Sequence, residues 1–268
     1  MYTPSFLFMK KILLCLSISV LFLTACNKVE DDLANQPQDN QIVPLVNEII
    51  PNAVTDYDGN SYDAVCIGEQ VWMASNLRTT HYANGEEIPE YDLSNHSSAN
   101  YIISCDDVAH YGYLYSWPAV MHYSSSSEAN PSEVQGICPN GWHVPSNAEW
   151  NQLFTYVGSF SEYVCSENSE NVAKALAANH DWEDASMWDE CAIGNNLSAN
   201  NATNFNILAA GRGDGDHVIY LGIAASFWTC TAKSCQASYD KQFFYDQPAV
   251  VHYANQTHVH CSVRCVRD

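Results

Sequence analysis

Residues 136–150 read GICPNGWHVPSNAEW, and this stretch decides the local structure around which the chain is organised. Ser146 and Glu149 have the S-x-x-E spacing of a capping box, in which each side chain accepts a hydrogen bond from the other residue's backbone N–H. Apolar residues then follow at i, i+3, i+4 and i+7, forming one helical face of Trp150, Leu153, Phe154 and Val157. The stretch therefore predicts a turn that leads into a helix ending near Gly158.

Five further stretches accompany it along the chain. They are DYDGNSY at 56–62, IGEQVWMASNLRTT at 67–80, YGYLYSW at 111–117, FWT at 227–229 and SVRCVRD at 262–268. With CPNGWHVPSNAEW at 138–150, they resemble the motifs of the Fibrobacter succinogenes major paralogous domain family over roughly residues 54–268. That family resembles the C-type-lectin-like and sulfatase-modifying-factor folds. The resemblance implies an α+β, C-type-lectin-like domain with two main helices, twisted antiparallel strands and long loops. It also implies a disulfide between Cys138 and Cys265.

The remaining pattern favours short elements around the first helix. Asp58-Gly59 lies between two tyrosines and predicts a hairpin turn rather than a calcium loop, because the twelfth loop position, Ile67, cannot bind a cation. A second, short helix is expected from Val172 to about Asn179. Short strands are predicted at 205–210, 219–228, 241–245, 250–253 and 260–266. The expected core includes five tryptophans: Trp72, Trp117, Trp142, Trp150 and Trp228.

Residues 1–25 have the composition of a secretory leader. Lys10 and Lys11 precede an apolar run at 12–23 that is short for a membrane span. Leu-Thr-Ala-Cys at 23–26 resembles a bacterial lipobox, so Cys26 is the expected lipidated N-terminus; the alternative is an ordinary signal peptide cleaved nearby. Residues 26–53 are polar and acidic and predict a tether.

The acidic cluster at 30–32 resembles the surface-export signal of Bacteroidetes lipoproteins, although a solvated linker has the same composition. The sequence therefore predicts a lipoprotein anchored in the outer membrane and facing the cell exterior, with its domain at 54–268.

Charge and cysteine content narrow the function further. Losing Lys10 and Lys11 with the leader takes the formal charge from −21 to −23, which excludes nucleic acid as a partner because phosphate contacts need a basic surface.

Nine cysteines remain after Cys15 and Cys26 are set aside, and such usage in an exported chain predicts disulfides rather than zinc knuckles. The nine are at 66, 105, 138, 165, 191, 230, 235, 261 and 265. Because nine is odd, at least one stays free or pairs between chains.

No catalytic residue, metal or cofactor is predicted. His143 and Glu149 are interpreted as a structural hydrogen-bonded pair rather than an acid–base pair, since the capping box already uses Glu149. His258 and His260 have H-x-H spacing with His252 nearby, but no carboxylate completes a metal site, so exposed strand histidines are expected. The tripeptide RGD at 212–214 has the composition of an ordinary turn.

The predicted function is non-catalytic binding or adhesion, with glycan or a host or cell-surface protein as partner. An anchor, a spacer and a loop-rich lectin-like domain favour this interpretation. Four loop aromatics are the candidate ligand-binding residues, because such rings stack on sugars: Tyr101, Tyr123, Trp182 and Trp188. An enzyme related to the sulfatase-modifying factors and a structural subunit of a surface filament are the alternatives.

Overall fold

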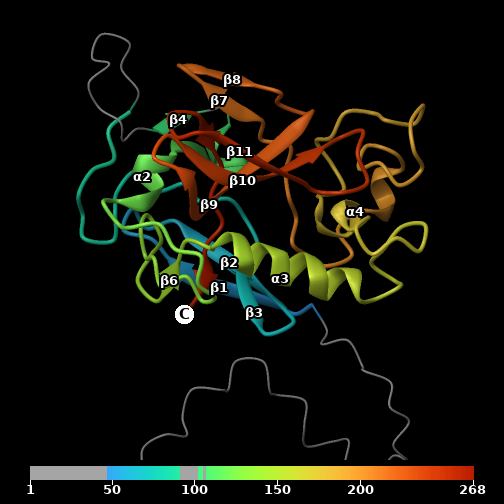
Figure 1. Cartoon of the computed structure of the whole chain (residues 1–268), viewed down its shortest axis with the longest axis horizontal. Helices are drawn as coiled ribbons and strands as arrows, with labels where there is room; N and C mark the ends of the chain where they lie inside the picture. The colour runs from blue at the N-terminus through green and yellow to red at the C-terminus, as the bar shows by residue number, and fades with distance from the viewer. Residues whose placement is uncertain (1–46, 91–101, 105–106) are drawn as a thin grey trace, which may run out of the picture. The chain divides into compact units, whose positions relative to one another are not determined.

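The architecture is mainly β in the computed structural model, which describes residues 47–90, 102–104 and 107–268. Its strands form three antiparallel sheets, and one helix, α3 (Asn147–Gly158), extends over 12 residues (Figure 1). The other α-helices of these residues are short: α1 (Val108–Tyr111), α2 (Trp117–Met121) and α4 (Ala173–Leu176), with a 3-10 turn at Leu197–Ala199. The prediction of an α+β, C-type-lectin-like fold with two main helices is therefore wrong.

The first sheet joins strands from both ends of the described chain. Its spatial order is β1 (Ile49–Thr55), β2 (Ser61–Ile67), β3 (Gln70–Met73), β13 (Val266–Arg267) and β6 (Trp142–His143). The β1–β2 hairpin turns at the predicted Asp-Gly pair, where Gly59 adopts φ +84°. The Asp56 carboxylate closes this turn by accepting hydrogen bonds from the Asn60 backbone N–H (2.9 Å) and the Tyr62 hydroxyl (2.6 Å). The hairpin prediction is confirmed.

Two further sheets complete the architecture. The three-stranded sheet has the order β11 (Val251–Gln256), β10 (Ala237–Phe244) and β9 (Ala224–Ser234). The second five-stranded sheet has the order β4 (Ile102–Ser104), β5 (Tyr113–Ser116), β12 (His260–Cys261), β7 (Arg212–Asp214) and β8 (His217–Ile219).

The predicted strands at 241–245 and 250–253 overlap β10 and β11. The predicted strand at 219–228 contains the turn between β8 and β9, and 205–210 forms only a bridge from Ile207 to Ala177. The predicted terminal strand is two short strands in different sheets, β12 and β13, because the chain between them buries the side chain of Arg264.

The capping box starts α3 as predicted. The Ser146 hydroxyl accepts a hydrogen bond from the Glu149 N–H (3.2 Å), and the Glu149 carboxylate accepts one from the Ser146 N–H (2.8 Å). Behind the cap, the Trp150 ring packs 4.7 Å from Trp72 of β3 and 5.6 Å from Phe227 of β9, measured between ring centroids. Helix α3 therefore lies between the first sheet and the three-stranded sheet, as Figure 1 shows.

The predicted second helix is reduced to the four residues of α4. All four are buried, so no solvent-facing side supports a longer amphipathic helix. The next residue, Ala177, is extended at ψ 146° and bridges to Ile207, which ends the helix.

Of the five tryptophans expected in the core, Trp117 is only half-buried, and its indole N–H donates to the Thr229 carbonyl (2.9 Å). The other four are buried.

Strand β1 begins within the predicted tether, at Ile49. The leader, Cys26 and most of the tether lie outside the described residues. Among the residues that are described, no helix is long and apolar enough to cross a membrane.

Candidate functional site

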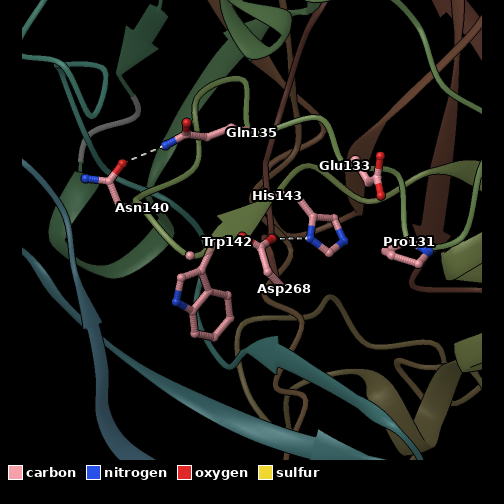
Figure 2. Close-up of a pocket in the computed structure, with 8 residues that line it drawn as sticks. Pro131, Glu133, Gln135, Asn140, Trp142, His143 and Asp268 are labelled. Carbon is pink, nitrogen blue, oxygen red and sulfur yellow. Dashed lines mark hydrogen bonds and ion pairs between the residues drawn. The ribbon is translucent and has the colours of Figure 1, made fainter. Parts of the chain in front are cut away.

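A cavity of about 310 Å³ opens beside β6 and the end of β13. Eight residues line it: Pro131, Glu133, Gln135, Asn140, Gly141, Trp142, His143 and Asp268 (Figure 2). They come from the loop before β6, from β6 itself and from the last residue after β13. The pairing of Val266 with His143, and a hydrogen bond from the Asp268 N–H to the Gly141 carbonyl (3.1 Å), bring these segments together.

The Cys138–Cys265 disulfide links the same two segments, with Cα atoms 6.0 Å apart. It is the pair that the family resemblance implies. A second disulfide joins Cys165 and Cys191, and Cys66 is also disulfide-bonded. Three cysteines of the described chain are free thiols: Cys230 and Cys261, which are buried, and Cys235, which is exposed.

His143 forms the buried wall of the cavity, with two carboxylates on its ring. Its Nε2 lies 2.6 Å from Glu149 Oε1 and its Nδ1 lies 2.7 Å from Asp268 Oδ1 (Figure 2 draws the second contact). Burial alone would lower the pKa of His143, but the hydrogen bonds and charges of Glu149 and Asp268 outweigh it and raise this pKa. Because both ring nitrogens are occupied, neither is free to accept a proton from a substrate.

Glu149 is equally engaged. One carboxylate oxygen accepts from the Ser146 N–H (2.8 Å) and the Ser132 N–H (3.2 Å), and the other faces His143. Glu149 therefore caps α3 and holds His143 with the same carboxylate. Serine, threonine, cysteine and lysine are all missing from the described residues that line the cavity, so the lining supplies no hydroxyl, thiol or amine nucleophile.

The rim of the cavity is polar and exposed. Glu133, Gln135 and Asn140 present two amides and a carboxylate to solvent, and the Gln135 Nε2 donates to the Asn140 Oδ1 (3.0 Å). Glu133 adopts φ +60°, in the left-handed region that non-glycine residues rarely occupy. Groups of this kind bind hydroxyl and amide groups of small polar ligands.

The four predicted binding aromatics do not gather at this cavity. Tyr123 and Trp188 are exposed, with 79% and 61% of their surfaces accessible, but neither lines the cavity. Trp182 is buried, and its indole N–H donates to the Ile207 carbonyl (3.2 Å). Tyr101 lies outside the described residues.

Of the three histidines predicted to be exposed, His252 and His258 are exposed and His260 is not. His260 is fully buried in β12, and burial lowers its pKa to about 4. His252 lies on β11, where its Nδ1 is 2.6 Å from the Lys241 ammonium. The RGD tripeptide forms β7, and its Gly213 pairs with Val218 on one side and His260 on the other. It is therefore a strand within a sheet, not a loop tip.

Sequence reasoning missed Gln135, Asn140 and Asp268 as cavity residues. Asp268 was visible only as the last letter of the SVRCVRD motif, and nothing in that motif predicts that β13 pairs with β6. The signal that could have located this site is the implied Cys138–Cys265 disulfide, because it places the motif at 138–150 beside the motif at 262–268.

Comparison with known proteins supports the family to which the motifs point, and it indicates no particular activity. No curated protein and no solved structure matches the chain. The sequence profile of the Fibrobacter succinogenes major domain matches residues 65–267, which include the end of β2, all of β3 to β13 and all but the last residue of the cavity. The chain therefore belongs to the Fibrobacter succinogenes major domain family.

Proposed function

We propose that this protein is a non-catalytic binding module that takes a terminal sugar of a glycan in the cavity beside His143. The observation that carries the proposal is the lining itself, in which the carboxylates of Glu133 and Asp268 and the amides of Gln135 and Asn140 surround one small space. Sugar hydroxyls both donate and accept hydrogen bonds, so they need mixed acceptors and donors of this kind. At about 310 Å³, the cavity is at the small end of ligand pockets, which suits one terminal sugar.

Binding without turnover follows from the state of His143. A general base must have a nitrogen free to reach the proton that it removes. Here, the two nitrogens face carboxylates at 2.6 and 2.7 Å, so the histidine supports the shape of the cavity instead of acting on a ligand. An enzyme related to the sulfatase-modifying factors would need a reactive thiol or an imidazole with a free nitrogen, and the described lining offers neither.

Display on the cell surface belongs to the same proposal. The apolar leader and the Leu-Thr-Ala-Cys box support lipidation at Cys26, and the polar tether separates that anchor from the domain. A module held in the outer membrane and facing the exterior would meet glycans or surface proteins of other cells. The negative charge of the chain keeps it soluble at such a surface.

The experiment is a glycan array with the purified full chain in detergent, followed by calorimetric titration of the best binder. Asn140→Ala and Glu133→Gln should each weaken binding by at least about tenfold, because each removes a polar contact from a site with few of them. Gln236→Ala, at an exposed position between β9 and β10, is the matched control and should leave binding unchanged.

Two results would contradict the proposal. If Trp188→Ala abolishes binding while the cavity variants retain it, the ligand contacts the exposed loop at 184–190 and not the cavity. If no glycan binds and a surface protein does, the partner is a protein. The array and titrations distinguish these outcomes because each variant changes only one surface.

The alternative of a filament subunit is favoured by one observation, the exposed free thiol of Cys235 in the turn between β9 and β10. A thiol there is accessible for a disulfide between two chains, unlike the buried Cys230, whose pKa burial raises to about 12. Non-reducing electrophoresis of surface material should then show covalent multimers that disappear in a Cys235→Ser variant. Monomers alone would remove this alternative.

A further inference from the structure

Two histidines and an aspartate meet on the surface far from the cavity residues in sequence. His110 belongs to α1, while His180 and Asp181 follow α4, seventy positions later in the chain. The Asp181 Oδ2 lies 2.5 Å from His110 Nε2 and 2.8 Å from His180 Nδ1. One atom from each side chain lies within 4.8 Å of the other two. The three side chains are 39%, 47% and 30% exposed, so an ion from solvent can reach them.

The donor set selects the class of ion. Two imidazole nitrogens with one carboxylate oxygen suit zinc and neighbouring divalent transition metals. Calcium and magnesium prefer sites made entirely of oxygen. We propose that His110, His180 and Asp181 form a binding site for a divalent transition metal ion, with zinc as the ion of choice.

The geometry requires only small movements. Ligand atoms around a tetrahedral zinc ion lie about 3.3 Å apart, given bond lengths of about 2.0–2.1 Å. The two contacts at Asp181 would therefore open by less than 1 Å, and the two histidine nitrogens, which lie within 4.8 Å of each other, would close by at most about 1.5 Å. Rotation of these partly exposed side chains can supply both movements. His110 would bind through Nε2 and His180 through Nδ1, and each ring would carry its proton on the other nitrogen.

The loop that carries the carboxylate is held in place. Asp181 has φ +64°, in the left-handed region that aspartate tolerates better than most residues. Two residues later, the Glu183 N–H donates to the Gly222 carbonyl (2.8 Å), which anchors this loop to the turn before β9. The net charge of −21 also favours a cation.

Three protein ligands leave a coordination position for water or for a group from a partner. The ion would also join the segment between β4 and β5 to the loop after α4, two segments that are distant in sequence. An ion that binds the folded chain and not the unfolded one raises the unfolding temperature. The site therefore predicts both binding and stabilisation, which are measured independently.

The test is titration of zinc into the purified full chain, without a histidine tag and after chelator treatment. We expect one zinc per chain and a higher unfolding temperature with zinc. His110→Ala and Asp181→Asn should each weaken zinc binding by at least about tenfold, since the loss of an outer-shell partner alone weakens sites by 10–100-fold. Asn also tolerates positive φ, so Asp181→Asn leaves the backbone unstrained. His217→Ala removes an exposed histidine that lies 3.2 Å from Asp216, and this matched control should bind zinc like the original chain.

The exposed thiol of Cys235 is the competing site, and X-ray absorption distinguishes the two. Zinc on His110, His180 and Asp181 gives nitrogen and oxygen neighbours at about 2.0–2.1 Å, whereas a thiolate ligand gives sulfur at about 2.3 Å. Zinc binding that persists in both ligand variants, or that disappears in Cys235→Ser, would overturn the proposal. So would the absence of stoichiometric zinc binding, because the three residues would then be a hydrogen-bonded cluster only.

Discussion

The carboxylate of Glu149 lies 2.6 Å from the imidazole of His143, so the residue that caps α3 also holds the histidine in the wall of the cavity. One side chain thus caps α3 and positions a residue of the cavity wall. A change at Glu149 should therefore affect both the stability of the domain and the shape of the cavity.

Replacing Glu149 with Gln should destabilise the domain strongly. The variant keeps the shape but removes the buried one of the two carboxylates on His143, leaving only the exposed Asp268, and it weakens the cap; breaking a buried pair costs about 3–5 kcal/mol. Urea unfolding of both proteins measures the difference. Glu162→Gln, at an exposed position beyond the end of α3, is the matched control and should change stability by less than about 0.5 kcal/mol. A loss below about 1 kcal/mol for Glu149→Gln would show that the pair contributes little.

His143 should make stability fall as pH rises. Its pKa is higher in the folded chain than the ordinary value of 6.5, so its contribution is fully present below pH 6.5 and is lost as pH rises through the folded value. The difference in unfolding free energy between the original chain and His143→Gln should therefore be largest in mildly acidic solution and shrink in alkaline solution. Denaturant unfolding over a pH series measures it, and a difference that grows with pH would contradict this sign.

Arg264 should be intolerant of replacement. Its guanidinium is fully buried and donates to Asn76 Oδ1 (3.0 Å), to the Asn206 carbonyl (2.7 Å) and to the Phe205 carbonyl. Burial lowers the pKa of Arg264 to about 9 because it disfavours the charged form. The hydrogen bonds offset part of the free-energy cost of burying the charged guanidinium.

Arg264→Met removes the donors and leaves buried acceptors unpaired, with an expected loss of about 3 kcal/mol or more. Arg267→Met, three positions later and only half-buried, should cost less than about 1 kcal/mol. Thermal unfolding compares the two variants. Equal losses would mean that the network around Arg264 adds nothing specific.

Removing the Cys138–Cys265 disulfide should cost more than removing Cys165–Cys191. The first closes a sequence separation of 127 residues and the second one of 26, which correspond to about 5 and about 3.5 kcal/mol when only chain entropy is counted. Paired cysteine-to-alanine variants, unfolded in urea, test the order. Peptide mapping without reductant tests the pairing, and Cys138 linked to any cysteine other than Cys265 would refute it.

Cys26→Ala should release the protein from the membrane fraction, because lipid is the only anchor that the leader and tether predict. Cys15→Ala, within the leader, is the matched control and should leave fractionation unchanged. Protease treatment of intact cells then distinguishes exterior display from an anchor that faces the periplasm. Membrane fractionation that survives Cys26→Ala would argue against lipidation.

The sequence by itself determined the local structure at two places. The S-x-x-E spacing at Ser146 and the i, i+3, i+4 pattern behind it specify α3, because capping and helical periodicity depend on residues within two turns of one another. The Asp-Gly pair at Asp58 specifies the β1–β2 turn for the same reason. The motifs also identified the family, since they depend on residue identity and order alone.

Only the tertiary structure decided the rest. Helix α4 stops after four residues because Ala177 bridges to Ile207, and the final segment divides between two sheets because Arg264 is buried. The cavity exists because β13 pairs with β6, and the cluster of His110, His180 and Asp181 exists because the loop after α4 reaches α1. Each of these contacts joins residues far apart in sequence, where no local spacing, propensity or turn signal records which segments will meet.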